Sequence, residues 1–194
     1  MKIFAFLFIL SFVCLTGCKT VKPVAEINLN ASQTPVNNAV VATPVVNFSD
    51  QATWLLGYFN PGQFTQEPHS AWYIKNYDDY QVNTQAINKL FEISKDGLSI
   101  KIVMGTWCPD SRREVPRFMR ILDVWKFQLT KVTFIGVDNA KLSPVGEYEK
   151  LKIQRVPTFI INKNIIEAGR IIENPVTSLE QDMVNILTVM NNNN

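Results

Sequence analysis

A seven-residue string, Gly105-Thr106-Trp107-Cys108-Pro109-Asp110-Ser111, joins a strand-like segment to a helix-like one. Residues 98–104 are rich in Ile and Val, which favours a buried strand. Residues 109–127 repeat apolar side chains at helical spacing, and Pro109 suits the first helical position, where no backbone N–H is needed. A strand that runs directly into a helix is typical of α/β domains.

Apolar periodicity and turn residues divide the rest of the chain into an alternating series. We expect helices at 84–94, 146–152 and 179–190, and strands at 132–137, 158–161 and 165–172, with the last two strands joined as a hairpin at Lys163-Asn164. The resulting order, α-β-α-β-α-β-β-α, predicts an α/β fold with a central mixed β-sheet and helices on both faces.

The first eighteen residues have the pattern of an export signal. Met1-Lys2 is followed by the apolar run 3–13, which is shorter than the roughly 20 residues that a membrane-spanning helix needs. Leu15-Thr16-Gly17-Cys18 is similar to the lipobox of bacterial lipoproteins, in which the cysteine is acylated and the acyl chains hold the protein on a membrane. We expect removal of 1–17 and a lipid on Cys18; a plain signal peptide is the alternative.

The mature chain divides into three parts. Residues 18–47 are expected to form the lipid anchor and a flexible tether, because no helical or strand period persists there. Residues 48–83 form an aromatic-rich N-terminal extension that we expect to pack on the core, with a ligand-binding aromatic wall as the alternative. Residues 84–194 form the main domain.

Composition excludes several classes of function. The 19 basic and 17 acidic residues leave a net charge of +2, and no basic stripe predicts nucleic-acid binding. One histidine, His69, and three cysteines are too few for a zinc or iron–sulfur site built from this chain alone, so we expect no metal and no cofactor. We expect His69 to lie at the surface or in a turn rather than to pair with a cysteine.

After maturation, Cys108 would be the one remaining free thiol. Its position before Pro109 places the sulfur at the start of a helix, where free backbone N–H groups and the helix dipole favour a thiolate. Ser111, one turn later, could donate a hydrogen bond to that thiolate. Arg112 and Arg113 would add positive charge, whereas Asp110 would oppose it. The alternative is that Cys108 is a small apolar filler.

These residues resemble the active site of the thioredoxin superfamily. Trp107-Cys108-Pro109-Asp110-Ser111 is similar to the family's Trp-Cys-x-x-Cys motif with the second cysteine replaced by serine. Pro116 matches the family's helix proline, and Val156-Pro157-Thr158 resembles its cis-proline loop, which lies beside the active cysteine. The resemblance covers about 84–190 and implies a thioredoxin-like fold; the Gly-Thr-Trp-Cys-x-Asp-(Ser/Thr) form is similar to exported bacterial members.

Two departures from the family restrict the chemistry that the resemblance implies. Ser111 replaces the thiol that normally resolves a mixed disulfide, and Ile102 stands where classical thioredoxins carry a buried aspartate. Exchange between two thiols of the chain is therefore not expected. Attack by Cys108 followed by release with an external thiol remains possible.

The resemblance implies a membrane-tethered monothiol protein in the bacterial cell envelope. It would face the periplasm, on the outer rather than the inner membrane because Lys19 follows Cys18. Cys108 and Ser111 would be catalytic. The residues expected to contact a protein or low-molecular-weight thiol or disulfide client are Trp107, Pro109, Asp110, Val156 and Pro157. A docking module without turnover is the alternative, so whether the chain is an enzyme stays open; a peroxidase is disfavoured because the peroxiredoxin motif is missing.

Overall fold

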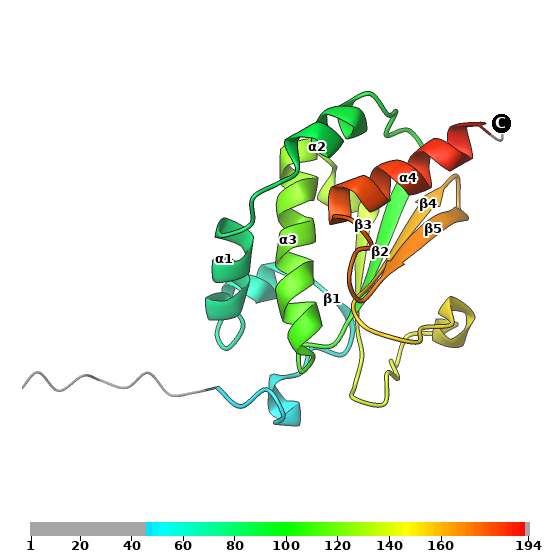
Figure 1. Cartoon of the computed structure of the whole chain (residues 1–194). Helices are drawn as coiled ribbons and strands as arrows, with labels where there is room; N and C mark the ends of the chain where they lie inside the picture. Colours follow the sequence, from blue (N-terminus) through cyan, green and yellow to red (C-terminus); the bar gives the residue numbers. More distant parts are fainter. Residues whose placement is uncertain (1–45, 193–194) are drawn as a thin grey trace, which may run out of the picture. The chain divides into compact units, whose positions relative to one another are not determined.

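The computed structural model describes residues 46–192, which form a mixed sheet with helices packed on it (Figure 1). The strands are β1 (Gly57–Phe59), β2 (Leu98–Met104), β3 (Val132–Gly136), β4 (Thr158–Lys163) and β5 (Ile166–Ile172). Their order across the sheet is β1-β3-β2-β4-β5. The β2–β3 pair is parallel and the other three pairs are antiparallel. The predicted α/β fold with a mixed sheet is confirmed.

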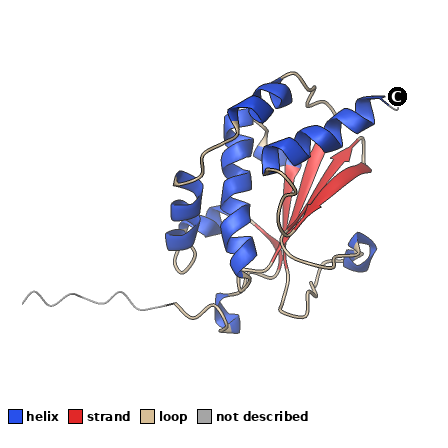
Figure 2. Cartoon of the chain, in the orientation of Figure 1, coloured by secondary structure: helices blue, strands red, loops and turns tan. Residues whose placement is uncertain are grey.

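Figure 2 distinguishes the helices, strands and loops of the described residues. The structure has the α-helices expected near 84–94, 109–127 and 179–190, and it adds α1 (Ser70–Asp78), which the sequence analysis did not predict. The α-helices are α1 (Ser70–Asp78), α2 (Thr84–Phe91), α3 (Pro109–Trp125) and α4 (Leu179–Asn192). Short 3-10 helices are η1 (Gln51–Thr53), η2 (Pro61–Thr65), η3 (Leu129–Lys131) and η4 (Tyr148–Leu151). The helix expected at 146–152 is therefore only the single turn η4.

Local sequence explains where α2 and α3 begin and end. The side chain of Asn83 accepts a hydrogen bond from the backbone N–H of Ala86 at 3.1 Å, which caps the start of α2. Pro109 occupies the first turn of α3, and Lys126 ends that helix in a left-handed conformation. The indole N–H of Trp125 donates to the carbonyl of Leu90 at 2.8 Å and so joins the ends of the two helices.

The two faces of the sheet are covered very differently. Along β2, Leu98, Ile100, Ile102 and Met104 point into a core that also contains buried residues of α2, α3 and α4. Val103 points to the opposite face, where a smaller apolar cluster includes Tyr148 of η4. Helices were predicted on both faces. The helix predicted for the second face is only the 3-10 turn η4.

Aromatic residues of 48–83 pack against the helix-covered core. Phe64 is fully buried, and its ring lies 5.8 Å from that of Phe134 on β3 and 5.6 Å from that of Trp72 on α1. Sequence reasoning missed β1, whose three residues pair with Phe134, Ile135 and Gly136 of β3. The extension therefore also contributes an edge strand to the sheet.

The predicted signal peptide, the predicted lipid-attachment residue Cys18 and nearly all of the predicted tether lie outside the described residues. Within residues 46–192, no helix has the length and apolar character that crossing a membrane requires.

Candidate functional site

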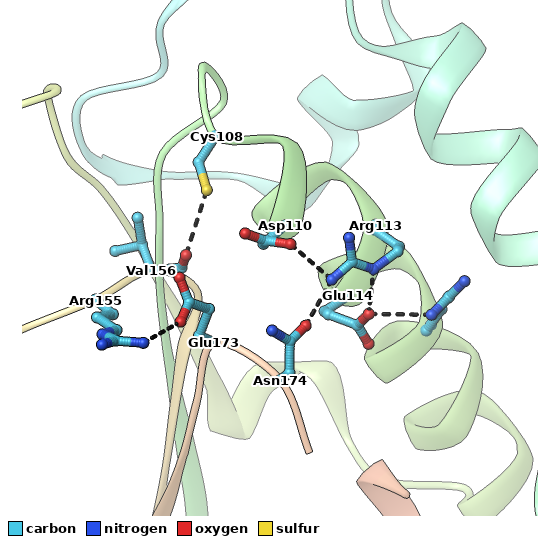
Figure 3. Close-up of polar contacts among 9 residues, drawn as sticks. Cys108, Asp110, Arg113, Glu114, Arg155, Val156, Glu173 and Asn174 are labelled. Atoms are coloured by element: carbon cyan, nitrogen blue, oxygen red, sulfur yellow. Dashed lines mark hydrogen bonds and ion pairs between the residues drawn. The ribbon is translucent and has the colours of Figure 1, made fainter. Parts of the chain in front are cut away.

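Cys108 lies where β2 ends and α3 begins, and it is the N-cap residue of that helix. Its side chain is only 7% exposed. The thiol donates a hydrogen bond to the backbone carbonyl of Val156, at a sulfur–oxygen distance of 3.3 Å (Figure 3). The sulfur makes no capping hydrogen bond with the free N–H groups of the first turn of α3, although Cys108 is the N-cap residue. The structure therefore brings together the helix start and the Val156 loop, as the sequence predicted.

The Val156–Pro157 peptide bond is cis, which confirms the expectation for this loop. Two hydrogen bonds hold the loop: the hydroxyl of Thr158 donates to the carbonyl of Arg155 at 2.6 Å, and the N–H of Glu173 donates to the carbonyl of Pro157 at 2.7 Å. The loop thus presents the Val156 carbonyl to the sulfur from a fixed position.

Ser111 does not have the partner that the sequence suggested. Its side chain is fully buried, and its oxygen accepts a hydrogen bond from the backbone N–H of Gly105 at 3.3 Å. Among the contacts of the described residues, no hydrogen bond joins Ser111 to the sulfur of Cys108, because the thiol points toward Val156. Ser111 therefore stabilises the turn between β2 and α3.

Trp107 flanks the sulfur on the side of β3. Its indole N–H donates to the carbonyl of Val137 at 3.0 Å, and its ring centroid lies 6.4 Å from that of Trp54. A Cβ atom at Gly105 would overlap the indole, so glycine is needed there for the ring to lie flat against the turn. The orientation of Trp107 is fixed by these contacts on three sides.

The acidic groups near the site are neutralised by arginines (Figure 3). Asp110 pairs with Arg113 at 2.6 Å. Glu114 is buried and pairs with Arg113 at 2.6 Å and with Arg117 at 3.0 Å. The predicted opposition of Asp110 to a thiolate is therefore offset by a direct ion pair.

Arg112 fixes the turn before Cys108. Its guanidinium donates to the carbonyls of Thr106 and Trp107 at 2.8 and 2.9 Å, and it lies 4.4 Å from the ring centroid of Phe48. Burial lowers the pKa of Arg112, and a negative charge on Cys108 would raise it. The cation expected near the sulfur is present, and it also holds the backbone of the motif.

A cavity of about 360 Å³ opens beside the sulfur. It is lined by Trp107, Cys108, Lys141, Gln154, Arg155, Val156 and Glu173. Arg155 and Glu173 form an ion pair at 2.7 Å. Sequence reasoning missed Lys141, Gln154, Arg155 and Glu173, because they come from three loops that only the folded sheet brings together. The one indication in the sequence was that these polar residues lie in loops that follow or precede the predicted strands.

Larger cavities lie away from the sulfur. One of about 640 Å³ is lined by residues of β1 and β3, and one of about 450 Å³ lies between β5 and α4. Neither is lined by a cysteine or histidine. The candidate site is therefore the smaller cavity, which is lined by Cys108.

The N-terminal extension contacts the motif through Thr106 and does not line the Cys108 cavity. The hydroxyl of Thr106 donates to the carbonyl of Thr53 at 3.1 Å and accepts from the N–H of Leu55 at 3.2 Å. A Cβ atom at Gly136 would overlap the carbonyl of Leu55, so the segment passes directly over β3 there. The lining of the Cys108 cavity includes no residue of 48–83.

His69 lies in a turn, which was one of the two predicted positions, but it is buried rather than at the surface. It is 4% exposed and packs between Phe48 and Trp72, with ring centroids at 6.2 and 5.8 Å. Burial lowers its pKa, whereas the charge of Glu67 raises it. In residues 46–192, no group of three or more His, Cys, Asp or Glu side chains could hold a metal ion.

Comparison with known proteins does not place the chain in a family. No family model matches the sequence, and no curated protein matches it. Among solved structures, the chain is similar to a protein of unknown function from Pseudomonas aeruginosa, with a TM-score of 0.48 and 9% sequence identity. That similarity covers 72% of this chain and 95% of the other. The function is therefore argued from the site itself.

Proposed function

We propose that this chain is a thioredoxin-like monothiol protein that acts in thiol–disulfide exchange through Cys108. It would be held by a lipid on Cys18 in the bacterial cell envelope, at the outer rather than the inner membrane, and exposed to the periplasm. Its clients would be proteins or low-molecular-weight compounds that carry a thiol or disulfide.

One observation carries the proposal. Cys108 is the N-cap of a 17-residue helix, and its sulfur lies 3.3 Å from the carbonyl that precedes the cis Pro157. From β2 to α4 the elements follow one another in the order that the sequence predicts, with η4 in place of one helix. The cavity beside the sulfur gives a small disulfide or an extended peptide a place to approach.

The chemistry follows from the contacts of the sulfur. Loss of the thiol proton removes the hydrogen bond to Val156, because a thiolate cannot donate. The thiolate would then be stabilised by the start of α3 and by Arg112. It attacks one sulfur of a client disulfide, so that the new S–S bond forms as the old one breaks and the leaving thiolate takes up a proton.

Release needs a second thiol from outside the chain. Ser111 has no sulfur and is engaged with Gly105, so it cannot resolve the mixed disulfide. A low-molecular-weight thiol would attack the mixed disulfide, return Cys108 to its reduced form and leave oxidised with the client sulfur.

The test is mixed-disulfide formation in the full chain with Cys14 and Cys18 replaced by serine. Bis(2-hydroxyethyl) disulfide is added at pH 7, and intact-protein mass spectrometry follows the adduct. We expect adduct formation at least tenfold faster than with free cysteine, and none after Cys108→Ser. A rate at or below that of free cysteine would remove the proposal.

The burial of Cys108 favours a second candidate, a docking module without turnover. A thiol that is 7% exposed and engaged with a carbonyl can be inert. Capture of a protein client that survives Cys108→Ser would favour docking. Capture that is lost with the sulfur would favour covalent exchange.

A further inference from the structure

We propose that the Cys108 cavity selects small disulfides that carry carboxylate groups. This inference rests on the proposed exchange chemistry and names the substrate class of the same site. It depends on the charges around the cavity and on the cavity's size.

Two acidic groups near the sulfur, Asp110 and Glu173, are already paired with arginines. Asp110 is 2.6 Å from Arg113, and Glu173 on the cavity wall is 2.7 Å from Arg155. Each of these carboxylates therefore has a cation in direct contact, which offsets the repulsion that it would exert on an incoming anion.

Lys141 supplies a positive charge that the cavity does not neutralise. It lies in the loop after β3 and lines the same cavity as Cys108. No ion pair of Lys141 occurs among the residues that the structure describes. Arg112 adds a second cation beside the turn, and its hydrogen bonds go to backbone carbonyls rather than to carboxylates. Of the charged side chains that line the cavity, Lys141 and Arg155 are positive and Glu173 is negative, so the balance of the lining is positive.

The size of the cavity favours a small substrate. A volume of about 360 Å³ is near the lower end of the roughly 300–1,000 Å³ that is usual for ligand pockets. The bound half of a short disulfide would place its sulfur at Cys108 and its carboxylate toward Lys141. Attack by the Cys108 thiolate forms the mixed disulfide and releases the other half as a thiolate, with no further reactant in this step.

Three probes of similar length test the charge preference: 3,3′-dithiodipropionate with two carboxylates, bis(2-hydroxyethyl) disulfide with no charge, and cystamine with two ammonium groups. The protein is the full chain with Cys14→Ser and Cys18→Ser. Second-order rates of adduct formation at low ionic strength are divided by the rates of 2-mercaptoethanol with the same probes, which removes the intrinsic reactivity of each disulfide.

We expect the normalised rate to be at least tenfold higher for the dianion than for the dication. Lys141→Gln should reduce this ratio at least threefold, and Lys141→Glu should reduce it further. Lys89→Gln, an exposed site on α2, is the matched control and should leave the ratio unchanged. For the chain that keeps Lys141, the ratio should fall toward one in 0.5 M salt, because salt screens exposed charges.

The outcomes separate this inference from the proposed function. Equal normalised rates for the three probes, or a preference that Lys141→Glu does not change, would overturn the selection of carboxylates while exchange stands. Failure of all three probes to form an adduct at Cys108 would overturn the exchange chemistry, and the selection with it.

Discussion

The indole ring of Trp107 covers Gly105 on the side where any other amino acid would carry a Cβ atom. The two residues lie in the turn between β2 and α3, so the ring closes over the backbone immediately before the candidate nucleophile. The hydrogen bond from the indole to the carbonyl of Val137 fixes the ring against β3. The glycine of the motif is thus explained by the packing of the tryptophan two residues later.

Gly105→Ala should destabilise the protein because the new methyl group overlaps the Trp107 ring. We expect the free energy of unfolding to fall by about 1–3 kcal/mol, as for other overpacked sites. Urea denaturation followed by tryptophan fluorescence would measure the loss. Gly146→Ala is the matched control, because a Cβ atom there meets nothing within 4 Å. Equal stability of the two variants would contradict the packing argument.

The parts of the fold that local pattern controls could be predicted from the sequence. The β2–α3 junction follows from an apolar strand, a proline at the helix start and helical spacing, and the structure has β2 at Leu98–Met104 and α3 from Pro109. The cis bond before Pro157 was predicted by resemblance, and the structure has it. The β2–α3 junction depends on residues that are close together in the chain, whereas the expectation of the cis bond rests on the resemblance.

The features that the sequence analysis missed or predicted wrongly depend on contacts made only in the folded chain. β1 has only three residues and forms because β3 offers it an edge, so no strand period could reveal it. Ser111 turns to Gly105 rather than to the sulfur because the Val156 loop occupies that side of the thiol. His69 follows a proline in a polar stretch, yet aromatic rings from two segments bury it.

Glu114→Gln should weaken the link between the first turns of α3. The buried carboxylate of Glu114 accepts from Arg113 and Arg117, and a neutral amide would make weaker hydrogen bonds with both. Because each arginine is about one third exposed, we expect a loss of only about 1–2 kcal/mol in the free energy of unfolding.

Lys75→Gln provides the comparison for Glu114→Gln. It breaks an exposed ion pair with Asp79 and should cost less than about 0.5 kcal/mol. Urea denaturation of both variants under the same conditions would measure the two losses in the free energy of unfolding. If the two substitutions cost the same, burial of Glu114 does not strengthen its ion pairs.

Acid should destabilise the protein through His69. Burial lowers the pKa of His69 below its ordinary value of 6.5, so the unfolded chain binds a proton more readily than the folded one. This contribution to stability is present above pH 6.5 and is lost as the pH falls through that value toward the lower pKa of the folded state. We expect the melting temperature to fall between pH 7.5 and 5.5.

His69→Phe should flatten that pH dependence, because phenylalanine fills the aromatic site without titrating. His69 is the only histidine of the chain, which makes the comparison direct. Thermal unfolding at several pH values would give the two slopes. Parallel slopes for His69→Phe and the unsubstituted chain would assign the acid sensitivity to other groups.

Thr106→Val should loosen the attachment of the Thr53–Leu55 segment to the motif. The Thr106 hydroxyl bridges the carbonyl of Thr53 and the N–H of Leu55, and valine has nearly the same shape but no hydroxyl. We expect hydrogen exchange at the Leu55 amide to become about tenfold faster, because its hydrogen-bond acceptor is lost. Thr106→Ser keeps the hydroxyl and should retain most of the protection. If both variants exchange as slowly as the unsubstituted chain, the extension is held by its aromatic packing and the Thr106 bridge adds nothing to it.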